Sequence, residues 1–399
     1  MNILHINKND IRGGAAKIAF SLFAAQNSTG QEAVLLVDNK EIDNDKIYKI
    51  KKSRWRFLLS YLFGTDIDFF DTNYLLQTDL FRQADIIHIH NIHSHFFNLK
   101  TLAKMAEAKP IVWTLHDLWP VTAYCAHPLD CPLVDGVYRC LTGATKSFFK
   151  KYNQCYLMAR KRKFFKDVDF NFVAPSAAVV KKLQGTILAD KKITLIHHGI
   201  NTDIFYPGNQ ARARKKLNLP ADKKIVLFAA AYGAGDFWKG WQFCQKILKE
   251  YSENKEVVFA CLGGQSNESS SNSLIIRGFA GDDKIMADYY RAADVVLFPS
   301  LAESFGLVII EAMACGTPVI SFPVGIAPEA IEHKISGYVA KYADELDFSH
   351  GLEFILGLSR VEKDNMAIAA RLTIQEKFTE QLMSQNYMQL YRNILAIKA

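Results

Sequence analysis

Two carboxylates eight residues apart carry the clearest chemical signal in this sequence. Glu303 and Glu311 belong to the stretch SLAESFGLVIIEAMACGTPVI at 300–320, where nearly all neighbours of Glu311 are apolar. A buried charge without partners is strongly unfavourable, so Glu311 needs a hydrogen-bonding partner. That partner is either a fixed donor inside the protein or a pair of hydroxyls on a ligand.

A predicted helix separates the two glutamates. It begins near Gly306 with Ser304 as its cap and ends near Cys315, because Gly316 suits the left-handed position after a helix and Pro318 prevents continuation.

Glu303 lies in the loop just before this helix, where free amides and the helix dipole favour an anionic ligand such as a diphosphate. Glu311 lies inside the helix. Together they predict a ligand that carries both phosphate and hydroxyl groups, and a nucleotide sugar has both.

The elements that position these residues form an alternating α/β pattern. Short β-branched runs alternate with helical stretches, which predicts parallel sheets covered by helices. The predicted strands are ILHI, AVLLV, DIIHIH, IVWTLH, FNFVAP, KIVLFAAA, VVFACLG, SLIIRG, DVVLFPS and PVISFP.

The 399 residues suit two domains, and the polar, proline-containing stretch at 199–222 predicts the boundary between them. We expect two doubly wound, Rossmann-like domains that face a central cleft, with ligands at the carboxyl ends of the strands. The expected limits are 1–204, 205–375 and a last helix at 376–399.

The stretch PSLAESFGLVIIEAMACGTPVI at 299–320 resembles the E-x7-E region of the retaining family-four glycosyltransferases, which have the GT-B fold. Weaker similarity lies in RGGA, TLHD, HHGINTDIF and WKG. The run from TLHDLWP to CAHPLDC is similar to the subgroup that builds exopolysaccharides such as colanic acid.

This resemblance implies a retaining, metal-independent glycosyltransferase of the hexosyltransferase type. The donor is a nucleoside-diphosphate sugar, and no cofactor is expected. The first domain would bind the acceptor and the second the donor, and the last helix would cross back to the first domain.

The resemblance also assigns roles to residues. Glu311 would bind the ribose hydroxyls, Glu303 would face the donor sugar, and Lys239 would stabilise the leaving diphosphate. The implied catalytic residues are His116, Lys239 and Glu303, and the implied donor-binding residues are Gly13, Gly14, Ser304, Phe305, Gly306, Leu307 and Glu311.

The sequence departs from the family pattern at two places. The stretch AAAYGAGDFWKG lacks the arginine that usually precedes the lysine, and Ile326 stands after Gly325 in place of a second glycine. The missing arginine leaves a rival interpretation open, a sugar-nucleotide-binding protein without activity. A sugar-nucleotide epimerase or a phosphorylase on the same fold is the nearest rival enzyme.

Three further motifs have structural alternatives. The glycine pair of DIRGGAAKIA either approaches a ligand or forms a tight turn. His116, at the end of a strand, either binds the donor sugar or is satisfied by a loop. In HIHNIHSH we expect His88, His90 and Asn91 to line the acceptor side, since the motif has no carboxylate or cysteine to complete a metal site.

The seven cysteines predict reduced thiols. Cys125, Cys131, Cys140 and Cys155 contain no C-x2-C pair, so free thiols are the expectation and zinc is the alternative.

A formal charge of +7 indicates an anionic partner. Segments 51–64 and 146–167 mix basic and aromatic residues, and they predict either solvated helices or attachment to an anionic membrane surface. No groove-reading motif points to nucleic acid. With no signal peptide or membrane span expected, the sequence predicts a cytoplasmic protein at the inner membrane face, acting on a lipid-linked or oligosaccharide acceptor in cell-surface polysaccharide biosynthesis.

Overall fold

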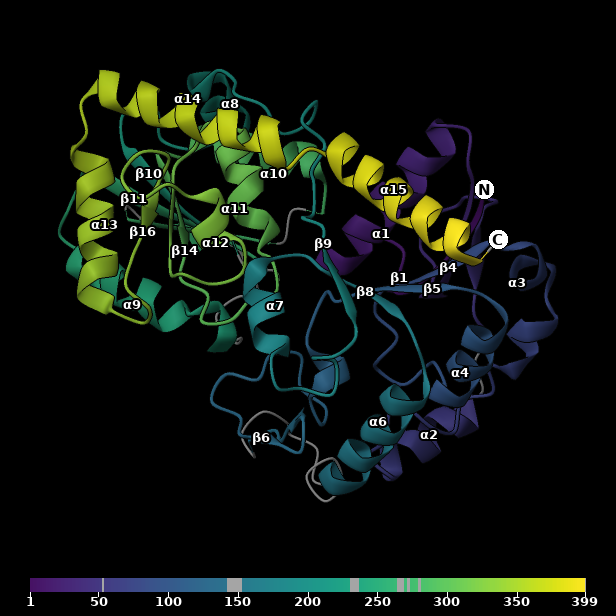
Figure 1. The fold of residues 1–399 in the computed structure, drawn as a ribbon. Coiled ribbons are helices and arrows are strands. Elements are labelled where there is room, and N and C mark those ends of the chain that lie inside the picture. Colours follow the sequence, from purple (N-terminus) through teal and green to yellow (C-terminus); the bar gives the residue numbers. More distant parts are fainter. Residues whose placement is uncertain are drawn as a thin grey trace. The chain divides into compact units, whose positions relative to one another are not determined.

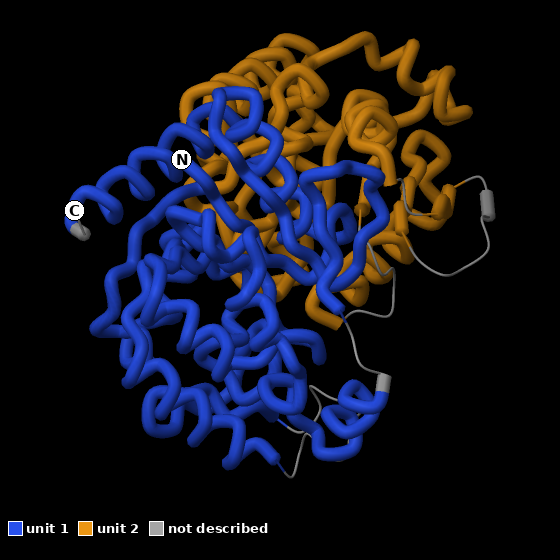
Figure 2. Tube along the Cα trace, turned by 90° about the vertical axis from the view of Figure 1, so that its right-hand side faces the viewer, with its two compact units in different colours: residues 1–197, 380–399 blue, residues 198–379 orange. Residues whose placement is uncertain are grey.

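The computed structural model describes residues 1–51, 54–141, 153–229, 237–263, 269–270, 273–278 and 281–398. The chain divides into two compact units, coloured in Figure 2: unit 1 comprises Met1–His197 and Glu380–Ala399, and unit 2 comprises His198–Thr379. The first boundary was expected at 204/205, which is several residues after the observed one. The second was expected at 375/376, which is several residues before the observed one.

Unit 1 is built on a parallel sheet with the strand order β3-β2-β1-β4-β5-β8-β9. Strands β4 and β5 are buried along their whole length, as expected where helices cover both faces of a sheet. The strands are β1 (Asn2–Asn9), β2 (Glu32–Asn39), β3 (Ile47–Lys49), β4 (Ile86–Ile89), β5 (Ile111–Thr114), β8 (Asn171–Ala174) and β9 (Lys192–Leu195).

Helices lie on both faces of this sheet. In Figure 1, α1 and the last helix α15 lie on one side of it, and α4 and α6 lie on the other. The helices are α1 (Gly14–Ser28), α2 (Arg54–Leu62), α3 (Asp79–Gln83), α4 (Leu99–Ala108), α6 (Gln154–Asp167), α7 (Ala177–Leu183) and α15 (Glu380–Lys398). Short elements are η1 (Asn73–Gln77), η2 (Trp119–Val121) and the hairpin of β6 (Leu133–Val134) and β7 (Val137–Tyr138).

Unit 2 has a second sheet with the order β12-β13-β11-β10-β14-β15-β16, in which only the short edge pairing of β12 with β13 is antiparallel among the described strands. The strands are β10 (Lys224–Ala229), β11 (Val257–Leu262), β12 (Ser269–Ser270), β13 (Leu274–Arg277), β14 (Val295–Phe298), β15 (Val319–Ser321) and β16 (Tyr338–Val339).

The helices of unit 2 surround this sheet. They are α8 (Gln210–Lys216), η5 (Phe237–Lys239), α9 (Trp241–Glu250), α10 (Asp283–Ala292), α11 (Leu307–Ala314), α12 (Ala327–Ala330), α13 (Glu345–Gly357) and α14 (Arg360–Lys377). None of the helices in the described ranges is long and apolar enough to cross a membrane.

The two Rossmann-like sheets confirm the predicted fold class, and each of the ten predicted runs contains a strand. Short strands near the sheet edges, such as β3, β9 and β16, were not predicted from the sequence. Their few residues, several of them polar, give too little periodicity to detect.

Candidate functional site

Two predicted catalytic residues of unit 2 form an ion pair. Nζ of Lys239 lies 2.5 Å from Oε1 of Glu303, although 64 residues separate them in the chain. The Lys239 side chain keeps 31% of its surface exposed and that of Glu303 keeps 12%, so the pair lies at an accessible but partly desolvated place.

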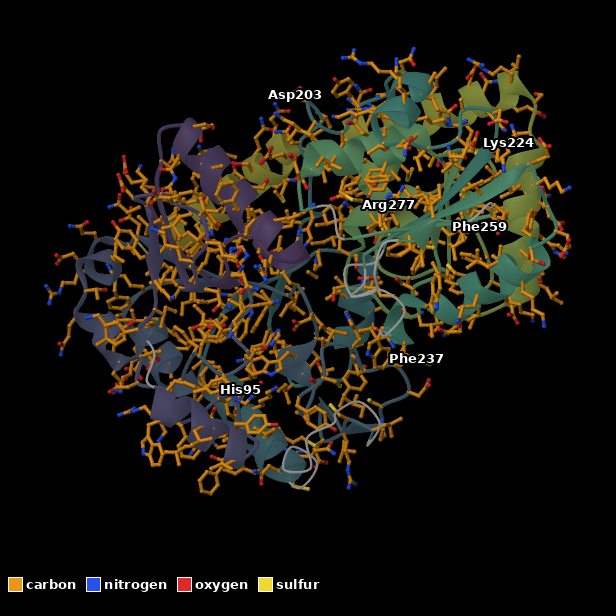
Figure 3. The ribbon with its side chains drawn as sticks, turned by 180° about the vertical axis from the view of Figure 1, so that it is seen from behind. His95, Asp203, Lys224, Phe237, Phe259 and Arg277 are labelled. Carbon is orange, nitrogen blue, oxygen red and sulfur yellow. The ribbon has the colours of Figure 1, made fainter. Side chains whose placement is uncertain are left out.

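A glycine brings the lysine to this place. Gly240 has a φ of +69°, and a Cβ atom there would lie 1.9 Å from the carbonyl oxygen of Pro299, so no side chain fits. The N–H of Leu301 donates to the carbonyl of Trp238 at 2.8 Å, which fixes η5 against the segment after β14. Phe237, labelled in Figure 3, begins η5 and is 63% exposed.

Glu311 is buried in α11 with 4% of its surface exposed, and it has a fixed donor. The hydroxyl of Tyr290, on α10, donates to Oε2 of Glu311 at 2.8 Å. Burial and the neighbouring carboxylate both raise the pKa of Tyr290 well above its usual value, so this phenol stays a donor. Of the two partners expected for Glu311, the internal donor is present.

The start of α11 differs from the expectation. Its N-cap is Gly306, in the left-handed region with a φ of +100°, and no side chain caps the helix. The prediction that Ser304 caps α11 is therefore wrong; the side chain of Ser304 is buried two residues earlier.

Phe305 packs inward against the rings of His198 and Phe378. Its carbonyl accepts the N–H of Ile326 at 2.7 Å. Ile326 is fully buried, so the residue that replaces the second glycine contributes to the core of unit 2.

In unit 1, three predicted site residues meet at the carboxyl ends of β4 and β5. His90, Asn91 and His116 line a small depression together with residues that include Asp117 and Trp119. Burial lowers the pKa of His116 to about 4, so its ring is neutral at physiological pH.

His88 does not belong to this depression. It is completely buried, its Nε2 lies 2.7 Å from Oγ1 of Thr114, and its Nδ1 lies 2.6 Å from the hydroxyl of Tyr391. Both ring nitrogens are thus engaged inside unit 1, and the expected acceptor contact of His88 is corrected to an internal one.

Asp117 holds the loop that follows His116. It pairs with Nε2 of His93 at 2.7 Å and accepts the N–H of Trp119 at 2.9 Å. Burial alone would raise the pKa of Asp117, but His93 and the backbone donor keep it below its usual value, so the group is ionised.

Gly13 and Gly14 are exposed at the start of α1. Gly13 has a φ of +91° and would find nothing within 4 Å of an added Cβ. The open backbone leaves room for a ligand, and the expected contact stays a prediction.

The cysteines with the zinc alternative do not converge as a set of four. Cys125 contacts both Cys131 and Cys140, and its Sγ atom lies 2.6 Å from that of Cys140, whereas Cys155 is exposed on α6. All seven cysteines are free.

One basic residue assigned to the membrane-facing segment is buried. Lys161 has no exposed surface, and its Nζ donates to the carbonyls of Trp119, Thr122 and Ala123 at 2.6–3.3 Å. This lysine fixes the loop after His116 to α6. Lys150 and Lys151, also assigned to that segment, lie outside the described residues.

Sequence reasoning missed Tyr290, Gly240 and the tyrosines of α15 as parts of these sites. The paired tyrosines of ADYYRAADVV at 287–296 were a usable signal, because a tyrosine on the apolar face of a helix needs a hydrogen-bond partner.

Two family models match this chain. Residues 12–204 match a model described as Glycosyltransferase Family 4, and residues 223–357 match one described as Glycosyl transferases group 1.

Curated relatives match part of the chain. The D-inositol 3-phosphate glycosyltransferase of Thermobispora bispora is 32% identical over 184 residues, which is 42% of each protein. That of Mycolicibacterium smegmatis is 30% identical over 195 residues, or 44% of each. In both cases the match covers less than half of the relative's own length.

Solved structures match the whole fold. Sucrose-phosphate synthase from Thermosynechococcus elongatus superposes with a TM-score of 0.73 at 19% identity and full coverage of both chains. Anabaena HepE in complex with UDP-glucose gives 0.70 at 16% identity, covering 98% of this chain and all of that one. The chain thus has the GT-B fold, with residues 12–204 similar to the Glycosyltransferase Family 4 model and residues 223–357 similar to the Glycosyl transferases group 1 model.

Proposed function

We propose that this protein is a glycosyltransferase that transfers a sugar from a nucleoside diphosphate to a hydroxyl of an acceptor, with retention of configuration and without a metal ion. The observation that carries the proposal is the pairing of Lys239 with Glu303 just before α11, a helix that also holds the buried carboxylate of Glu311. The two family models support it.

The leaving group decides the role of Lys239. As the glycosidic bond breaks, the diphosphate gains negative charge, and a nearby ammonium stabilises that charge most in the transition state. In this scheme Lys239 transfers part of its interaction from Glu303 to the diphosphate when the donor binds. Glu303 then faces the sugar, and the backbone of Phe305, Gly306 and Leu307 contacts the anionic part of the donor.

The other contacts complete the scheme. Glu311 accepts hydrogen bonds from the ribose hydroxyls while Tyr290 holds its carboxylate in place. His116 accepts a hydrogen bond from a sugar hydroxyl, because its ring is neutral. Asn91 and the backbone of Gly13 and Gly14 supply further contacts from unit 1. His90 does not, because it is fully buried and its two ring nitrogens lie 3.0 Å from His5 and 2.8 Å from His116.

A thermal-shift screen with UDP-, GDP- and ADP-sugars tests donor binding. A donor that binds the folded protein raises its melting temperature by mass action, increasingly with concentration. A panel without any concentration-dependent shift would contradict the proposal.

For the acceptor we propose a lipid-linked saccharide in cell-surface polysaccharide biosynthesis, reached by a cytoplasmic protein bound peripherally to the inner membrane face. The support is the surface of α2. Trp55, Tyr61 and Phe63, on this helix and just after it, are 69%, 55% and 54% exposed. Large exposed apolar side chains gathered on one segment are typical of an interaction surface.

The ends of α2 and α6 lie together in unit 1 (Figure 1). The side chain of Asn153, before α6, donates to the carbonyl of Phe63. His95, labelled in Figure 3, supports α2 from inside, since its Nδ1 lies 2.9 Å from Oγ of Ser60. Lys163 and Lys166, further along α6, are exposed basic residues.

We expect the protein to co-sediment with liposomes that contain anionic lipid, and to do so less at high salt. Each basic residue near such a surface contributes about 1 kcal/mol, which salt screens. The double variants Trp55→Ser/Tyr61→Ser and Lys163→Ser/Lys166→Ser should both weaken binding.

The matched control is Leu346→Ser/Val361→Ser, which removes two equally exposed apolar side chains from unit 2. Equal binding to neutral and anionic liposomes, or binding lost equally in the control, would argue against membrane attachment through α2.

The relatives favour a second acceptor class. D-inositol 3-phosphate glycosyltransferases, by their name, act on a small soluble phosphate. Transfer to inositol 3-phosphate in the absence of lipid would favour this acceptor over the lipid-linked one.

A further inference from the structure

A cavity of about 250 Å³ lies in unit 1 beside α2, separate from the depression at the ends of β4 and β5. Arg56 and Phe57 line it from α2, and four residues of the stretch Phe70–Tyr74 line it from the approach to η1. His95 and Phe96 line it from the loop after β4. The contacts proposed for the donor do not use this cavity.

The side chains of the cavity change from apolar at its floor to charged at its rim. Phe70 and Phe96 are buried, and Phe57 is half-exposed. Lys51 and Arg56 line the same cavity and are exposed. A ligand that suits both parts therefore carries an apolar group with a negative charge next to it.

The two cations of the rim can turn to such an anion. Nη2 of Arg56 lies 3.4 Å from Oδ2 of Asp71, in a pair exposed on both sides, and exposed pairs contribute little stability. Nζ of Lys51 lies 5.8 Å from the centre of the Tyr74 ring, and no carboxylate among the described residues pairs with it. Two cations against the one carboxylate of Asp71 leave a net positive charge at the rim.

The backbone beside the cavity has an uncommon conformation. Phe69, Ser94 and His95 have φ values of +67°, +74° and +66°, in the left-handed region that residues other than glycine rarely adopt. Phe69 directly precedes Phe70 at the floor, and Ser94 and His95 directly precede Phe96. Strained backbone of this kind gathers at ligand sites, where the surrounding contacts hold it in place.

Two contacts hold the loop after β4 in this conformation. Nζ of Lys8, on β1, donates to the carbonyl of Ser94 at 2.8 Å and lies 4.8 Å from the centre of the Phe96 ring. Nδ1 of His95, labelled in Figure 3, lies 2.9 Å from Oγ of Ser60 on α2. The floor of the cavity is therefore tied to β1 and to α2, so its shape exists before a ligand binds.

The same loop also lines the depression at the ends of β4 and β5. Ile92 and His93 belong to the depression, and His95 and Phe96 belong to the cavity. A ligand that occupies both hollows thus follows one short segment of chain. In a lipid-linked saccharide a phosphate joins the sugar to the apolar chain, and these three parts match the depression, the basic rim and the aromatic floor.

We propose that this cavity binds a lipid phosphate. Lys51 and Arg56 contact its phosphate, and the aromatic floor contacts the first carbons of its chain. A volume of about 250 Å³ is below the range of about 300–1,000 Å³ that encloses a whole small ligand, so the rest of the chain continues over the exposed apolar side chains of α2. The inference rests on the proposed function for the role of this lipid as part of the acceptor.

The experiment is isothermal titration of the full chain, without donor, with farnesyl phosphate below the concentration at which it forms micelles. Farnesol carries the chain alone, and inorganic phosphate and inositol 3-phosphate carry the anion without the chain. We expect one equivalent of farnesyl phosphate to bind at least about tenfold more tightly than any of the three, because only it makes both the charge-assisted hydrogen bonds and the apolar contacts.

Arg56→Ser and Phe57→Ser test the two parts of the site, and both side chains are exposed enough for the fold to tolerate the change. Each should weaken binding of farnesyl phosphate by about tenfold. Arg82→Ser is the matched control for the charge, since it breaks an exposed pair of the same length with Asp79 in unit 1. Leu195→Ser on β9 is the control for the apolar side chain, because Leu195 is as exposed as Phe57. Both controls should bind as the wild type does.

Three results would overturn the inference: no binding of farnesyl phosphate, equal affinity for farnesol, or the same loss in the controls as in the test variants. Tighter binding of inositol 3-phosphate than of farnesyl phosphate would also overturn it, in favour of a site for soluble phosphates. Sugar transfer in the absence of farnesyl phosphate binding would leave the proposed transferase intact without this site. Binding as expected without any sugar transfer would support the site and count against the proposed function.

Discussion

Lys239→Ala should lower kcat by about 100- to 1,000-fold while changing donor affinity far less. Removal of one group that stabilises developing charge typically has an effect of this size, about 3–4 kcal/mol. The ammonium already has a partner in Glu303, so it gains most when the diphosphate becomes more negative. Steady-state kinetics with the donor identified by thermal shift measures both quantities.

Lys246→Ala is the matched control for this substitution. Lys246 lies on the neighbouring α9 and pairs with Glu345 on the surface, so its loss removes an ion pair of the same kind away from the site. It should leave kcat within about twofold, because exposed ion pairs contribute little. A raised KM with unchanged kcat in Lys239→Ala would mean that the lysine only binds the donor.

Glu311→Ala should weaken binding of the nucleotide sugar by about tenfold or more. A hydrogen bond to a charged group contributes about 1.5–3 kcal/mol, and 1.4 kcal/mol is a factor of ten in affinity. The variant should also lose about 1–3 kcal/mol of stability, because the buried hydroxyl of Tyr290 loses its acceptor. Isothermal titration and chemical denaturation measure the two effects separately.

Tyr290→Phe removes the same internal hydrogen bond from the other side. It should lose stability to a similar degree and yet bind the donor clearly more tightly than Glu311→Ala, since the carboxylate is still present. Equal loss of donor binding in the two variants would show that Glu311 acts only through the structure of unit 2.

The sequence was informative where a pattern repeats locally. Ten apolar runs gave ten strands, and the end of α11 follows from Gly316, whose φ is +77°, with Pro318 beyond it. The motifs that contain Lys239 and Glu303 predicted that both are catalytic residues. The structure brings these two side chains into contact.

Contacts over long sequence separations were not predictable in the same way. Tyr391 meets His88 across 303 residues, and no local pattern distinguishes an internal histidine from one that lines a site. Lys161 was assigned to a solvated or membrane-facing helix because lysine is rarely buried. Its three carbonyl partners come from a loop whose course depends on the fold.

The central claim is sugar transfer with retention, and the stereochemistry of the product tests it most directly. The protein is incubated with the donor that shifts its melting temperature, with lipid-linked saccharide or inositol 3-phosphate, and with EDTA present. NMR of the product then reports the anomeric configuration. We predict transfer that withstands EDTA, retains the donor configuration and falls about 100- to 1,000-fold in Lys239→Ala. An inverted product, or a bound donor that is never consumed with either acceptor, would contradict the account.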